Sequence, residues 1–138
     1  MIPQKIEHIG IAVKDLEQAV AKYTLLLGTS PYRRELVESE GVEVVFFRIG
    51  ESKIELLQSL TSEGAIARFI DKYGEGIHHM AWQVEDIRSE MSRLKQEGLR
   101  LLSVEPKRGA EDKWVCFIHP ASAEGVLLEL CQDIKKEA

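Results

Sequence analysis

The sequence contains few cysteines. Only Cys116 and Cys131 occur among its 138 residues, and two thiols cannot form the disulfide framework that stabilises small secreted domains. Neither of them belongs to a Cys-x-x-Cys pair, which argues against a catalytic thiol. We therefore expect a cytoplasmic protein, in a reducing compartment.

Long apolar runs and an excess of positive charge are also missing. No stretch approaches the roughly 20 apolar residues of a membrane helix, and residues 1–5 do not resemble the start of a signal peptide. The formal net charge of -5 argues against a nucleic-acid partner, because nucleic acids are bound through a positive surface. We expect neither a membrane nor a nucleic acid as a partner.

An internal repeat is the first positive feature. Residues 6–16 (IEHIGIAVKDL) and 77–87 (IHHMAWQVEDI) align at an offset of 71, which places His8 on His79. Each copy predicts a strand that ends in an aspartate able to cap an amphipathic helix. Residues 62–73 predict a further helix, which links the two copies.

Three extended runs complete each copy of the repeat. They lie near 32–37, Val42–Ile49 and Lys53–Leu57, and again at Arg100–Val104, Lys113–His119 and Gly125–Cys131. The pattern predicts an α+β fold of two tandem βαβββ modules within one domain spanning 1–138. Module 1 would cover about 1–60 and module 2 about 76–134, and we expect the pair to enclose a shared metal-binding cavity.

The same offset relates two oxygen-bearing side chains. Adding 71 to Gln58 gives Glu129, so each copy has an imidazole on its first strand and an oxygen ligand on its last. These ligand types suit a divalent first-row metal. A single strand histidine is usually a structural or surface residue, but the pairwise relation favours a metal site of His8, Gln58, His79 and Glu129. We expect His78 to face away from it and His119 to lie in a turn.

Several segments resemble the vicinal oxygen chelate superfamily (the glyoxalase/bleomycin-resistance type). They are residues 8–13 (HIGIAV), 76–82 (GIHHMAW) and 125–130 (GVLLEL). Within it the chain most resembles the methylmalonyl-CoA epimerase family, through residues 78–82, 105–109 and 117–120 and through glutamine at position 58. The resemblance implies a divalent metal ion on the four residues named above, cobalt in the first place and manganese, nickel or zinc as alternatives.

The resemblance also implies an isomerase that interconverts (R)- and (S)-methylmalonyl-CoA. The α-proton of a thioester is weakly acidic, so the enolate needs a metal ion as a Lewis acid. Inversion needs an acid/base group on each face of the planar intermediate, and we assign these roles to Glu129 and Glu43.

The expected partner is a small-molecule acyl-CoA substrate, and the resemblance implies a homodimer. Basic side chains would meet the phosphates of the CoA tail. The sequence offers four candidates and does not choose among them: Arg33, Arg34, Lys107 and Arg108.

Three other functions occur on such a fold. A glyoxalase I type lactoylglutathione lyase would normally have glutamate in the place of Gln58. An extradiol dioxygenase needs iron with two histidines and one glutamate, usually in a longer chain. A non-catalytic binding protein would sequester a ligand without turnover, and the intact His8, His79 and Glu129 argue against it.

Overall fold

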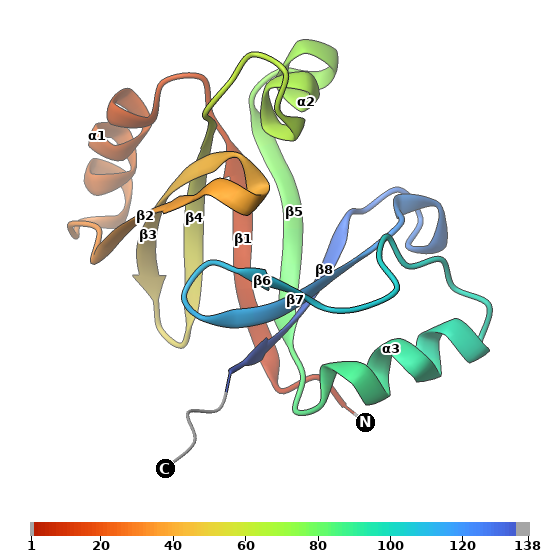
Figure 1. Ribbon diagram of the computed structural model, residues 1–138. Helices are drawn as coiled ribbons and strands as arrows, with labels where there is room; N and C mark the ends of the chain where they lie inside the picture. The colour runs from red at the N-terminus through yellow and green to blue at the C-terminus, as the bar shows by residue number, and fades with distance from the viewer. Residues whose placement is uncertain (1, 135–138) are drawn as a thin grey trace. The chain divides into compact units, whose positions relative to one another are not determined.

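The computed structural model describes residues 2–134 (Figure 1), which form two compact units. The N-terminal unit comprises residues 8–78. The C-terminal unit comprises the chain up to Glu7 and the chain from His79 onward. The boundaries fall within two strands, β1 (Lys5–Ala12) and β5 (Gly76–Gln83). Compact units are defined by contacts and the predicted modules by sequence similarity, so the module limits stay a prediction.

The N-terminal unit is a four-stranded sheet with a helix packed on one face. Its strand order is β2-β3-β4-β1, with β1 parallel to β4 and the other pairs antiparallel. Its further elements are α1 (Leu16–Leu27), β2 (Arg33–Val37), the 3-10 helix η1 (Glu38–Glu40), β3 (Val42–Ile49), β4 (Ser52–Ser59) and α2 (Ala65–Tyr73).

Helix α1 begins and ends where the sequence predicts. The Asp15 carboxylate accepts the Gln18 N–H at 3.1 Å, and Gly28 ends the helix with a left-handed φ of 68°. Helix α1 lies beside β3 and β4 (Figure 1). Its apolar side chains pack on every second residue of these strands, in a cluster with Val45 and Leu56. Strand alternation leaves the other face of the sheet for different residues.

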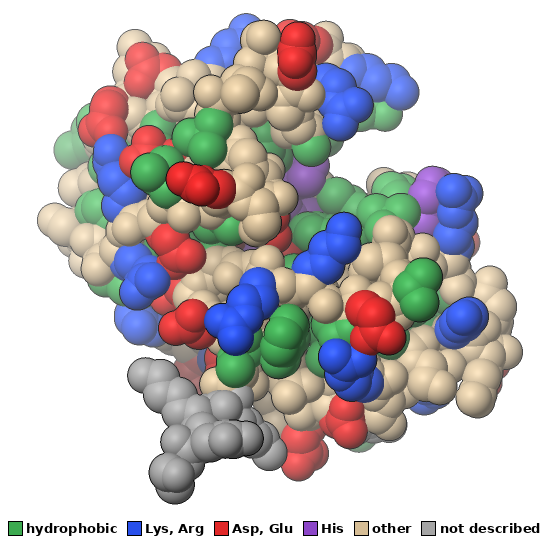
Figure 2. All heavy atoms as spheres, viewed as in Figure 1, with side chains coloured by type: hydrophobic (Ala, Val, Ile, Leu, Met, Phe, Trp, Pro, Cys, Tyr) green, Lys and Arg blue, Asp and Glu red, His purple; other side chains and the backbone are tan. Residues whose placement is uncertain are grey.

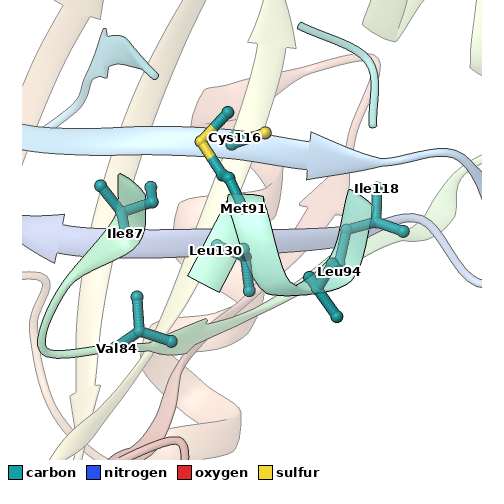
Figure 3. Packing of buried hydrophobic residues seen from close by; sticks show 7 residues of the cluster. All are labelled: Val84, Ile87, Met91, Leu94, Cys116, Ile118 and Leu130. Atoms are coloured by element: carbon teal, nitrogen blue, oxygen red, sulfur yellow. The ribbon is translucent and has the colours of Figure 1, made fainter. Parts of the chain in front are cut away.

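The C-terminal unit repeats this arrangement. Its strand order is β5-β8-β7-β6, with β5 parallel to β8 and the other pairs antiparallel. Figure 3 shows the side chains of α3 directed at those of the sheet in one cluster. Its further elements are α3 (Ile87–Gln96), β6 (Lys107–Gly109), β7 (Lys113–Ile118), the 3-10 helix η2 (Pro120–Ser122) and β8 (Leu128–Asp133).

One predicted strand is wrong. The run Arg100–Val104 forms only an isolated bridge from Leu101 to Ile118, and the edge strand is β6 instead. The Arg100 N–H bonds to Ser122 Oγ at 2.9 Å, so a side chain takes the place of a strand partner. The linker helix is confirmed as α2. Among the described residues, no helix combines the length and apolar character needed to cross a membrane.

Gly64, at the start of α2, has no room for a side chain. A Cβ there would lie 2.2 Å from Ser59 Oγ, which donates to the Thr61 carbonyl at 2.7 Å. We expect Gly64→Ala to lower the free energy of unfolding by roughly 1–2 kcal/mol, measured in urea, because Ser59 must give up this bond.

The clash disappears if Ser59 loses its hydroxyl, since Ser59 Cβ lies an ordinary 3.6 Å from the added atom. In a Ser59→Ala background, Gly64→Ala should therefore cost less than about 0.5 kcal/mol. An equal cost in both backgrounds would show that the steric explanation is incorrect.

Candidate metal centre

The C-terminal unit brings His79 and Glu129 together. His79 lies on β5 and Glu129 on β8, and they are 6% and 4% exposed. Nε2 of His79 lies 3.8 Å from Oε1 of Glu129, and the Phe117 ring contacts the imidazole edge-on with centroids 5.6 Å apart. A carboxylate buried beside an imidazole offers two donors that suit a divalent cation.

The N-terminal unit contains a similar pair, His8 on β1 and Glu55 on β4. They are 4% and 5% exposed, and Nδ1 of His8 lies 3.0 Å from Oε2 of Glu55. His8 is a ligand predicted from the sequence, whereas Glu55 is not among the predicted residues. This carboxylate is therefore the first functional candidate that the structure adds.

Gln58 has another partner. Its Oε1 accepts the backbone N–H of Leu16 at 2.6 Å, which satisfies a free donor in the first turn of α1. Gln58 and Leu56 alternate with Glu55 along β4, and Leu56 packs in the α1 cluster. The structure thus places Gln58 on the helix-covered face and not on the face of His8.

The repeat explains this difference, because its offset changes from 71 to 74 at the last strand. Gly10 pairs with Glu55 in β1–β4, and Ala81, which is Gly10 plus 71, pairs with Glu129 in β5–β8. Adding 74 to Glu55 gives Glu129. Adding 74 to Gln58 gives Gln132.

Gln132 has the same role in the C-terminal unit that Gln58 has in the N-terminal unit. Its Oε1 accepts the Ile87 N–H at 2.7 Å, at the start of α3. The paired residues Phe117 and Glu129 lie three residues further apart along the chain than the equivalent pair Phe46 and Glu55, which shifts the offset. A sequence signal for this register exists: residues 54–58 read IELLQ and residues 128–132 read LELCQ.

Glu43 lies on the face of Gln58. The two residues are direct cross-strand partners in β3 and β4, so their side chains share one side of the sheet. The Glu43 side chain is 29% exposed, and its Oε2 lies 3.6 Å from Nη1 of Arg34, which also binds Glu17 of α1 at 2.5 Å. The structure therefore does not bring Glu43 to His8.

Glu40, at the end of η1, is a second candidate that is not among the residues predicted from the sequence. Removal of water from its carboxyl and the negative charge of Glu55 together raise the pKa of Glu40 to about 7, while His8 opposes the shift. Glu35 contributes as well, and it lies on the face of β2 that corresponds to the Glu55 face of β4. The charges that act on the Glu40 carboxyl thus include those of Glu55 and His8.

The remaining histidines have other surroundings. The His78 ring meets Phe69 edge-on at 4.9 Å, and burial lowers its pKa. His119 precedes η2, and its Nδ1 accepts the Ala121 N–H at 3.0 Å. The expectation that His119 is a turn residue is confirmed.

Comparisons with known proteins give consistent results. A profile of the Glyoxalase/Bleomycin resistance protein/Dioxygenase superfamily matches residues 7–117. The ethylmalonyl-CoA/methylmalonyl-CoA epimerase of Cereibacter sphaeroides is 43% identical over 93% of this chain and 97% of its own. The human mitochondrial methylmalonyl-CoA epimerase is 40% identical over 93% of this chain and 73% of its own.

A solved structure extends the similarity to three dimensions. The Streptomyces coelicolor methylmalonyl-CoA epimerase in complex with 2-nitronate-propionyl-CoA has a TM-score of 0.93 and 31% identity, covering 99% of both chains. The predicted fold of two tandem βαβββ modules is confirmed.

Proposed function

Since the chain belongs to the Glyoxalase/Bleomycin resistance protein/Dioxygenase superfamily, and within it to the methylmalonyl-CoA epimerases, we propose that it interconverts (R)- and (S)-methylmalonyl-CoA. One structural observation carries the proposal. An imidazole and a carboxylate lie buried side by side in each unit, at the same register of the repeat. The chain is then an isomerase that acts on an acyl-CoA.

The two pairs fit a divalent metal ion. Burial of a carboxylate is costly unless a cation or hydrogen bonds compensate it, and imidazole with carboxylate is a typical donor set for first-row metals. We propose one ion per chain held by His8, Glu55, His79 and Glu129, with cobalt first and manganese, nickel or zinc as alternatives. When bound, the ion supplies a Lewis acid and a template for the carboxylate and thioester oxygens of the substrate.

Metal stoichiometry tests the sharing of one ion by the two units. One equivalent per chain, lost on replacement of either histidine, supports a shared ion. Two equivalents, each lost with one histidine, would indicate separate sites. The ligand set predicted from the sequence, with Gln58, has one carboxylate, whereas the set with Glu55 has two. Two carboxylates would neutralise the charge of a divalent ion.

Glu55 also changes how the epimerase is distinguished from a glyoxalase I type lyase. In the sequence, glutamine at position 58 favours the epimerase over the lyase, but the structure has Gln58 capping α1. The choice of the epimerase therefore rests on the relatives, at 40% and 43% identity over 93% of the chain.

The chain's own carboxylates move the protons. We assign one face of the planar intermediate to Glu129, as both ligand and acid/base group. For the other face we propose Glu40 in preference to Glu43, because Glu40 is electrostatically coupled to His8 and Glu55, while Glu43 pairs with Arg34. The group that removes the α-proton must be ionised, and the group that returns one must be protonated.

The test is incubation of the cobalt-loaded protein with one epimer in deuterated water. We expect deuterium at the α-carbon together with loss of optical purity, followed by mass spectrometry and chiral coupling to a stereospecific enzyme. Turnover of methylglyoxal with glutathione, without either change, would indicate a lyase. Binding of methylmalonyl-CoA without any turnover would indicate a non-catalytic ligand-binding protein.

We also infer from the family resemblance a homodimer in the cytoplasm. Light scattering on the purified protein measures the oligomeric state, and a mass of twice 15.6 kDa is the expected result.

A further inference from the structure

The edge strand β6 carries two adjacent cations on opposite faces. Arg108 pairs directly with Trp114 of β7, and its guanidinium carbon lies 5.3 Å from the centre of that ring. Trp114 packs against the α3 cluster. Arg108 is therefore on the helix-covered face of the C-terminal sheet, and the alternation of strand residues places Lys107 on the other face.

The face of Lys107 is the one that carries the candidate ligands. Lys107 pairs directly with Val115 of β7, and Val115 clusters with Ala81 and Cys131. Two residues along β7, Phe117 pairs with Glu129 and contacts the ring of His79. Lys107 thus shares one face of the C-terminal sheet with His79 and Glu129, on a strand two places from β8.

Other basic side chains that could bind an anionic ligand have ion-pair or ring partners. Arg33 binds Glu35 at 2.8 Å, and Arg34 binds Glu17 and Glu43. Lys113 shares the face of Lys107 but is buried, in contact with Asp133 and 3.9 Å from Glu7. Figure 2 shows basic and acidic side chains interspersed over the face in view.

Lys107 differs from all of these. Its side chain is exposed, and within residues 2–134 no ion pair engages it. An anion can therefore bind to Lys107 without displacing a partner, and its flexible stem can follow a mobile ligand. The matched neighbour Arg108 has the same charge sign, the same strand and the opposite face.

We propose that Lys107 binds a phosphate group of the CoA tail, and this inference rests on the proposed function. Strands lie about 4.8 Å apart, so Lys107 is roughly 10 Å across the sheet from the strand of Glu129. It is too far from the ligand pair to touch the reacting carbon. The pantetheine arm of an acyl-CoA separates its phosphates from the thioester, and it can extend over this face.

The experiment compares Lys107→Ala and Arg108→Ala on two substrates, methylmalonyl-CoA and the phosphate-free methylmalonyl-pantetheine. We expect Lys107→Ala to raise KM for the CoA substrate by about five- to tenfold with kcat within about twofold, because a uniform binding contact is lost. KM for the pantetheine substrate should stay unchanged. Arg108→Ala should leave both KM values within about twofold, and Lys107→Arg should restore the wild-type KM.

Two outcomes would overturn the inference: an unchanged KM for methylmalonyl-CoA in Lys107→Ala, or an equal rise for both substrates. The turnover rate of the wild type tests the proposed function itself, so failure of that function can be distinguished from failure of the Lys107 inference. If the wild type does not turn over, calorimetry with CoA itself applies the same test. Binding weakened by Lys107→Ala and not by Arg108→Ala supports the phosphate contact, and equal binding overturns it.

Discussion

Glu55→Ala is expected to lower the affinity for Co²⁺ by about 100-fold or more and to abolish most epimerase activity, whereas Gln58→Ala should change the metal affinity by less than about twofold. Glu55 lies 3.0 Å from His8, while Gln58 accepts the Leu16 N–H. The cost of Gln58→Ala should appear in stability instead, as a loss of roughly 1–2 kcal/mol, because a helix donor loses its acceptor.

Isothermal titration with Co²⁺ and urea unfolding measure the two effects independently. His8→Ala serves as the positive control for metal loss. Gln132→Ala is the matched control in the C-terminal unit, since Gln132 accepts the Ile87 N–H in the same way, and it should reproduce the Gln58 phenotype. Release of the metal by Gln58→Ala in a folded protein would restore Gln58 as the ligand and contradict the assignment of Glu55.

The second large effect is expected from Glu40→Gln. If Glu40 is the acid/base group on one face, its replacement should lower the rate of inversion by about 100- to 1000-fold. Glu129 on the other face still functions. In deuterated water, the epimer whose α-proton faces Glu129 should therefore exchange that proton faster than it inverts. Glu43→Gln should retain most of the inversion, because Glu43 faces α1 beside Arg34.

The pH profile gives an independent readout of Glu40. A carboxyl must be ionised to accept a proton, so kcat/KM should fall as the pH drops below the Glu40 pKa, which is about 7 before a metal ion lowers it. The Glu40→Gln variant should lose that limb. If Glu43→Gln stops inversion while Glu40→Gln is fully active, Glu43 takes the role.

Much of the architecture can be read from the chain alone. The His8 and His79 segments repeat at a constant offset, and a helix cap follows each of them. The extended run Val42–Ile49 is predicted with the bounds that the structure has. Local pattern suffices here because a strand or helix depends on residues within a few positions of one another.

The edge strand could not be read in the same way. Arg100–Val104 has the composition of a strand, but the Arg100 N–H bonds to Ser122 Oγ. The three-residue strand Lys107–Gly109 forms because β7 offers it a partner. Whether an apolar run becomes a strand depends on what lies beside it, and tertiary contacts override the local preference.

Among the candidate ligands, too, some follow from local sequence pattern and others from tertiary contacts. The sequence alone determined the fold class, the two histidines and the glutamate at position 129 as candidate ligands. The tertiary structure brings Glu55 and not Gln58 to His8, because the hydrogen-bond register of β4 sets which of two alternating residues faces His8. Three more residues separate Phe117 from Glu129 than separate Phe46 from Glu55, which shifts the repeat from 71 to 74. A constant offset along the sequence does not contain that information.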